Sequence, residues 1–367
     1  GLGTGAAEVA DGDGDGAEVA LPDASGPVGP PEDPEQPPRT STNPISAQRP
    51  RHRDVAPFIG RSFPAGPTLV STTGPALAAH PCPWHGFPMA TDTERLFPGK
   101  FFISTALEAL ETKTAMSADL ALRYLQRAGT AGLLIAIFYG AYFSTVATFT
   151  AIEVGGVPLT GLGKLIGALV FGWALVFIYY TKSELLTSNM MVASIGAYYK
   201  RVRWPRALRM LGLCFLGNFL GGLVVAVLAM ASTLASGPVL VEMQHSVAVK
   251  LGYLTAGPFG WSDLFVRAIL CNLMINVAML LVYNGFIKED ATKSLAMIMA
   301  VFIFAFLGLE HSVANTILFT IVGLKSGIDV GLAAGNVAIA LVGNFIGGGV
   351  MIGLYYAFVN DDSRYRR

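Results

Sequence analysis

One histidine of this chain lies inside a long apolar stretch, where an ionisable side chain is costly to bury. His311 stands between Phe306-Leu-Gly-Leu309 and Val313-Ala314. Ionisable groups at membrane depth usually mark substrate or proton pathways, and imidazole titrates near neutral pH. A core histidine bonded to a neighbouring helix is the structural alternative, and we favour the functional one. A single buried histidine cannot hold a haem or a dinuclear metal, so we expect neither an enzyme nor a cofactor.

Two stretches of the chain repeat each other at a constant offset of 126 residues. The repeated residues are Glu184 and Asn189, which recur as Glu310 and Asn315, and the motif Gly217-Asn-Phe-Leu-Gly-Gly222, which recurs as Gly343-Asn-Phe-Ile-Gly-Gly348. Paired, polar-interrupted apolar segments in two halves of a membrane protein point to a transport site. We expect the repeated carboxylates and asparagines to be structural, with the carboxylates accepting hydrogen bonds from backbone N–H groups freed by a helix break. The glycine motifs are expected to pack helices closely.

The segments that carry these residues are long enough to cross a bilayer. Mean hydropathy is +0.53, and six apolar segments approach or exceed the ~20 residues that a span requires. They run roughly over 129–152, 162–197, 208–234, 264–284, 294–323 and 330–358. The second and fifth are too long and contain polar interruptions, which predicts broken helices around a pore. Because each half has three spans, an odd number, the two repeats must be inverted. The stretch 101–127 is expected to be an amphipathic helix at the membrane interface.

The chain divides into three parts by composition. Seventeen of the 21 prolines lie between Pro22 and Pro98, so we expect residues 1–98 to form a disordered tail. Residues 99–360 form the transmembrane transport domain, and 361–367 a short basic tail. Basic residues beside the spans place both termini on the cytoplasmic side. We expect a multi-pass protein of the plasma or inner membrane, with an organelle envelope such as that of a plastid as the alternative. The formal net charge of zero gives no reason to expect nucleic acid.

Several other polar residues have two open interpretations. Thr187 either bonds its own backbone or points its hydroxyl into the pore, and Asn272 either bonds a neighbouring helix or lines the pore. Lys113 and Lys250 lie just outside spans, where most lysines are solvated or snorkel to the interface.

These residues resemble the signatures of the formate/nitrite transporter family. The similar segments are Glu184-Leu-Leu-Thr-Ser188, Cys271-Asn272, Gly308-Leu-Glu-His-Ser-Val-Ala-Asn315 and Gly343-Asn-Phe-Ile-Gly-Gly348. The resemblance covers about residues 102–358. It implies an aquaporin-like protomer of six helices in a homopentamer, with one pore in each protomer. Members carry formate, nitrite, hydrosulfide, acetate or lactate.

The resemblance also implies roles for single residues. His311 would be the central pore histidine, with Thr187 and Asn272 as its polar companions in the proton relay. Lys113 and Lys250 would be the vestibule lysines that attract anions. The hydrophobic constrictions would be formed by Phe171, Leu175, Leu185, Ile275 and Phe304.

Two residues depart from the family pattern and bear on substrate preference. Leu186 stands where many members have phenylalanine, and Lys182 adds a charge two residues before Glu184. Lys182 either pairs with Glu184 or biases the pore towards anions.

The residues favour one transport mechanism over the others. A bare anion cannot cheaply enter an apolar constriction, whereas positive vestibules concentrate it and protonation neutralises it. His311, hydrogen-bonded towards Thr187 or Asn272, would relay that proton. We therefore expect anion/proton symport or channel-like flux of a small monovalent weak acid across the bilayer. The alternative function is an aquaporin-like channel for neutral solutes, although the sequence lacks the two Asn-Pro-Ala motifs that such channels normally show.

Overall fold

The computed structural model describes residues 95–363 and 365, and most of this part of the chain is helical. The expected N-terminal tail therefore lies outside the described residues, except for 95–98. The helices are α2 (Lys100–Asp119), α3 (Ala121–Thr150), α4 (Thr160–Tyr180), α5 (Leu186–Tyr198), α6 (Trp204–Met230), α7 (Gly237–Thr255), α8 (Gly257–Tyr283), α9 (Asp290–Phe306), α10 (Ser312–Ser326), α11 (Val330–Asn344), the π-helix η1 (Phe345–Leu354) and α12 (Tyr355–Val359). Two short strands, β1 (Glu153–Val154) and β2 (Val157–Pro158), pair antiparallel between α3 and α4.

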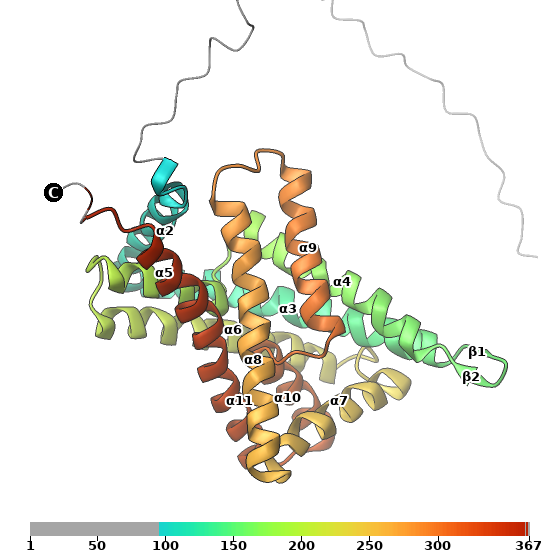
Figure 1. Ribbon diagram of the computed structural model, residues 1–367. Helices are drawn as coiled ribbons and strands as arrows, with labels where there is room; N and C mark the ends of the chain where they lie inside the picture. The colour runs from blue at the N-terminus through green and yellow to red at the C-terminus, as the bar shows by residue number, and fades with distance from the viewer. Residues whose placement is uncertain (1–94, 364, 366–367) are drawn as a thin grey trace, which may run out of the picture. The chain divides into compact units, whose positions relative to one another are not determined.

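Six helical runs of the described residues correspond to the six expected spans, and Figure 1 shows how the helices are arranged. Helices α3, α6 and α8 and the continuous run α11–η1–α12 cross without a break, while α4/α5 and α9/α10 are two broken crossings. In the described part of the chain, five helical runs are individually long and apolar enough to span a membrane, and α9 and α10 are each too short to do so alone. The predicted all-α membrane fold, with its second and fifth spans broken in two inverted repeats, is confirmed.

The structure differs from the sequence prediction at three places outside the breaks. Helix α3 begins at Ala121 rather than near residue 129, so the expected interfacial helix is shorter and ends at Asp119. Helix α7 precedes the fourth span, although its sequence suggested no element. Residues Phe345–Leu354 form a π-helix. Hydropathy averaging misses the start of α3 and the whole of α7, because both segments mix charged and apolar residues.

The two breaks use the same backbone turn. Lys182 and Gly308 follow α4 and α9 with φ of 55° and 63°, in the left-handed region. Ser183 N–H then donates to the Ile178 carbonyl at 3.0 Å, and Leu309 N–H donates to the Phe304 carbonyl at 2.9 Å. This hydrogen-bonding pattern closes a helix C-terminus. The chain then starts again as α5 or α10, so each broken span presents the N-terminus of a new helix to the interior.

Glycines of the repeated motifs bring the helices into backbone contact, as the sequence predicted. A Cβ on Gly221 of α6 would lie 1.8 Å from the Gly129 carbonyl oxygen of α3. In the second repeat, a Cβ on Gly347 would lie 2.1 Å from the Ile269 carbonyl oxygen of α8. No larger residue fits without moving a backbone, and small residues are the usual means of such close approach in membranes.

Candidate functional site

A small cavity lies where the two breaks meet. Its volume is about 20 Å³, enough for about one water molecule. The ten residues around it are Ile135, Phe171, Ala174, Leu175, Ile178, Leu185, Ile275, Val301, Phe304 and His311. All five residues expected to form the constrictions are therefore brought together around one space. His311 is the one polar side chain among the ten.

His311 is the N-cap of α10 and is held from both ring nitrogens. Ala314 N–H donates to Nδ1 at 3.1 Å, which leaves Nδ1 as the acceptor and places the proton of the neutral ring on Nε2. Nε2 lies 3.3 Å from the Thr187 hydroxyl oxygen. The Phe304 ring stacks on the imidazole, with centroids 5.9 Å apart. The ring is thus fixed in one tautomer, with its N–H directed at Thr187.

Among the described residues, Asn272 forms no hydrogen bond with His311. Its Nδ2 donates to the Thr187 carbonyl at 3.1 Å and to the Asn344 carbonyl at 2.6 Å. Asn276, one turn later, donates to the same Thr187 carbonyl at 3.2 Å and to Asn272 Oδ1 at 2.8 Å. Of the two expected partners of His311, Thr187 lies within hydrogen-bonding distance of the ring. Asn272 instead bonds the Thr187 carbonyl from a neighbouring helix and so helps to hold Thr187 in place.

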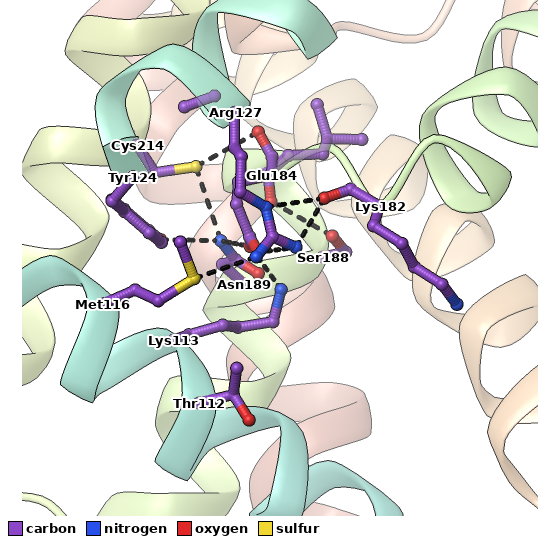
Figure 2. A network of polar contacts seen from close by, with 12 residues as sticks. Thr112, Lys113, Met116, Tyr124, Arg127, Lys182, Glu184, Ser188, Asn189 and Cys214 are labelled. Carbon is purple, nitrogen blue, oxygen red and sulfur yellow. Dashed lines mark hydrogen bonds and ion pairs between the residues drawn. The ribbon is translucent and has the colours of Figure 1, made fainter. Parts of the chain in front are cut away.

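At the first break, Glu184 lies in a network of cations and amides (Figure 2). Lys113 forms an ion pair with its Oε2, and Arg127 Nη2 lies 3.2 Å from its Oε1. Asn189 Nδ2 donates to Oε2 at 3.1 Å. Arg127 also donates from Nε and Nη2 to the Lys182 carbonyl, at 2.9 and 2.6 Å. Glu184 is buried, so its charge is matched by these partners rather than by water.

The second break repeats this arrangement with fewer partners. Lys250 Nζ lies 2.9 Å from Glu310 Oε1, and Asn315 Nδ2 donates to Glu310 Oε2 at 2.6 Å. Arg267, the counterpart of Arg127, pairs with Asp263 instead, at 2.8 Å. Lys113 and Lys250 are therefore not ordinary surface lysines: each compensates a buried carboxylate.

The backbone groups freed by the breaks are bound by asparagines of the glycine motifs, not by the carboxylates. Asn218 Oδ1 accepts from Leu186 N–H at 3.1 Å, while its Nδ2 donates to the carbonyls of Ala128 and Glu184, each at 2.8 Å. The expectation that Glu184 and its counterpart accept these N–H groups is wrong, because both carboxylates are taken by cations and side-chain amides.

Asn344 makes the equivalent set of bonds at the second break. Its Oδ1 accepts from Ser312 N–H at 2.9 Å, and its Nδ2 donates to the carbonyls of Ala268 and Glu310 at 2.8 and 3.0 Å. The sequence contained the signal for these two asparagines, because both recur at the common offset. The packing role that the sequence predicts for these motifs is therefore only part of what the two asparagines do.

Two larger cavities contain the expected vestibule lysines. The first, which we call the α2 vestibule, has a volume of about 480 Å³ and is lined by Lys113, Arg127, Lys182 and Glu184 among others. It shares Leu175 and Ile178 with the central cavity. The second, the α7 vestibule, has a volume of about 370 Å³, and Lys250, Arg267 and Glu310 line it. Each vestibule is thus adjacent to one of the two breaks.

Comparisons with known proteins agree on one family. The family model described as formate/nitrite transporter matches residues 102–358. The formate channel FocA of Haemophilus influenzae is 33% identical over 51% of this chain and 61% of the relative. The nitrite transporter NirC of Salmonella typhimurium is 29% identical over 54% of this chain and 72% of the relative. The chain thus spans less than two thirds of that FocA.

Solved structures show the same fold. An FNT family ion channel superposes with a TM-score of 0.61 at 22% identity, covering 71% of this chain and all of the other. A structure titled as a pentameric formate channel with formate bound has a TM-score of 0.52 at 20% identity, covering 67% of this chain and 98% of the other. The relatives are named as channels and transporters rather than enzymes. The two buried breaks, the motifs that build them and a family model that matches most of the chain lead to one conclusion: this protein is an integral membrane protein of the formate/nitrite transporter family.

Proposed function

We propose that this protein carries small monovalent weak-acid anions, such as formate, nitrite, acetate, lactate or hydrosulfide, together with a proton. One observation carries the proposal. Nine of the ten residues around the central cavity are apolar and the tenth is His311. A bare anion in such a space loses its hydration without compensation, whereas its neutral acid needs only one hydrogen-bond partner.

His311 supplies that partner and the proton. A proton that arrives from solvent adds to Nδ1 and charges the ring. The imidazolium then passes the proton on Nε2 to the anion, and the neutral acid leaves between the apolar residues. The ring is then neutral with its proton on Nδ1, and transfer of that proton to Nε2 through water restores the tautomer that accepts from Ala314 N–H. Charging costs the bond from Ala314 N–H, because Nδ1 can no longer accept it. The charged ring is therefore short-lived, which favours rapid transfer to a bound anion.

The vestibules, the assembly and the location belong to the same proposal. Cations that line both vestibules concentrate anions at the entrances, although Lys113 and Lys250 also neutralise buried carboxylates. The pentameric title of one structural neighbour supports a homopentamer with one pore in each protomer. The plasma or inner membrane is the proposed location, and a plastid envelope is the alternative.

Uptake by the His311→Asn variant tests the proton relay. Asparagine is a preferred N-cap, so its side chain can still accept from Ala314 N–H and preserve the start of α10. We expect the variant to fold and assemble but to lose pH-coupled uptake of labelled formate and nitrite in proteoliposomes between about pH 5 and 8. Unchanged, pH-dependent uptake by the folded variant would refute the relay. Uptake of water or glycerol with no anion flux would instead support the neutral-solute channel.

A further inference from the structure

A lysine occupies a backbone position that favours glycine. Lys182 has φ of 55° in the turn that ends α4, and its counterpart in the second repeat is Gly308 with φ of 63°. In this region the Cβ of an L-residue crowds the backbone, so such residues are uncommon there. The carbonyl that Arg127 binds belongs to the backbone, and glycine would provide it equally well. The backbone at this position therefore gives no reason for a lysine in place of glycine.

The ammonium group of Lys182 is set apart from the other charges around the α2 vestibule. Three cations and two carboxylates line this cavity, namely Lys113, Arg127, Lys182, Glu108 and Glu184. Lys113 and Arg127 both pair with Glu184. Lys182 forms no ion pair within 4.0 Å in the part of the chain that the structure describes. Without Lys182, the cations and carboxylates of the lining would be equal in number.

The side chain is held away from Glu184 and remains accessible. Its Nζ lies 5.0 Å from the centroid of the Tyr179 ring, a cation–π contact that orients the ammonium without neutralising it. Figure 2 shows the Lys182 side chain pointing away from the Glu184 network, while its carbonyl faces Arg127. Lys293 Nζ lies 3.1 Å from Asp290 Oδ1 and lowers the pKa of that carboxyl, to which Lys182 adds only a smaller contribution.

We propose that Lys182 is the anion-recruiting residue of the α2 vestibule, where its ammonium raises the local concentration of small monovalent anions ahead of the constriction. This inference rests on the proposed transport function. The corresponding position beside the α7 vestibule is Gly308, so the two vestibules do not share this lysine. The lining of the α7 vestibule has a different cation outside the ion pairs of the described residues, Lys164. Lys182 acts on anions that enter from the α2 side, and it acts through charge rather than through a specific geometry.

Three variants separate the charge from the backbone. Lys182→Gly removes the ammonium and installs the residue of the other repeat, so the turn is preserved. Lys182→Arg retains the charge. Lys200→Gly is the matched control, because Lys200 is an exposed lysine with φ of 57° that is absent from the lining of either vestibule.

The measurement is the concentration dependence of nitrite uptake from the α2 side in oriented proteoliposomes. Two unit charges about 7 Å apart in water interact strongly enough to change local concentration about threefold. We therefore expect Lys182→Gly to raise the apparent KM about threefold at ~0.01 M salt, with the maximal rate unchanged. The effect should vanish at ~1 M salt, where the Debye length is about 3 Å. Lys182→Arg and Lys200→Gly should keep the parent KM.

The outcomes distinguish this inference from the proposed function. Nitrite transport by the parent protein with the same KM in Lys182→Gly at low salt would overturn the role of Lys182 and leave the transport function standing. A raised KM that persists at high salt, or that Lys182→Arg shares, would also overturn it, because neither result follows from charge. No anion transport by the parent protein would overturn both.

Discussion

The ion pair between Lys250 and Glu310 gives the sharpest prediction for the stability of the second break. Replacing Lys250 with methionine preserves most of its apolar stem but removes the ammonium. Glu310 Oε1 then loses a partner 2.9 Å away, and among the described residues the amide of Asn315 is the hydrogen-bond donor left to the carboxylate. The side chains of the pair are 9% and 3% exposed, so the carboxylate is largely shielded from water.

The size of the effect follows from this burial. Removing one partner of a buried pair costs about 3–5 kcal/mol, because the other charge remains uncompensated. We expect this loss in the free energy of unfolding for Lys250→Met and for Glu310→Gln separately. The double variant should lose much less than the sum of the two losses, since a neutral pair is left and Asn315 can still donate to the glutamine oxygen. Lys250→Glu should prevent assembly, because it places two carboxylates together.

A double-mutant cycle on the purified protein measures this coupling. Unfolding is followed by circular dichroism as sodium dodecyl sulfate is titrated into mixed micelles. Lys293→Met is the control, because Lys293 pairs with Asp290 at 3.1 Å while 71% of the Asp290 side chain is exposed, and exposed pairs contribute little. Additive losses from Lys250→Met and Glu310→Gln, or a loss no larger than that of the control, would refute this role for the pair.

Three further predictions concern the packing and the ends of the chain. Asn344→Ala should lower the free energy of unfolding by about 1–3 kcal/mol, because it leaves Ser312 N–H buried without its acceptor. The same titration with sodium dodecyl sulfate, carried out on the purified variant, measures this loss. Gly347→Ala should destabilise the protein by about 1–3 kcal/mol through overpacking, whereas Gly212→Ala, with nothing within 4 Å of the added Cβ, should be neutral or stabilising. Equal thermal stability of the two glycine variants would contradict this contrast. Deleting residues 1–94 should leave anion uptake and the oligomeric state in detergent unchanged, and a smaller assembly would show that the tail has a structural role.

The sequence was informative where the evidence lay within one segment. The polar interruptions of two overlong apolar spans located both breaks, since polar backbone at membrane depth must be buried in protein or line a cavity. The common offset identified the repeated carboxylates and asparagines. The resemblance predicted five apolar constriction residues, and all five line one cavity. No spacing within the chain alone would have predicted that Phe171 and Ile275 lie around the same space.

Contacts between distant segments could not be predicted in the same way. Lys113 and Glu184 are 71 positions apart, and Lys250 and Glu310 are 60, so nothing local identifies either pair. The sequence left Lys182 between pairing with Glu184 and acting on anions, and the structure shows that Lys113 and Arg127 already pair with that carboxylate. The sequence does not predict that Asn218 binds the backbone at the first break, because its partners Leu186, Ala128 and Glu184 are 32 to 90 positions away.

The most direct test of the proposed transport is simultaneous measurement of anion uptake, internal pH and membrane current in proteoliposomes that contain the parent protein. A weak acid that crosses the apolar constriction as a neutral molecule carries one proton with each anion. We therefore predict internal acidification in proportion to formate or nitrite uptake, with no net current. A steady current of anions with no matching change in internal pH would contradict proton-coupled passage through the site at His311.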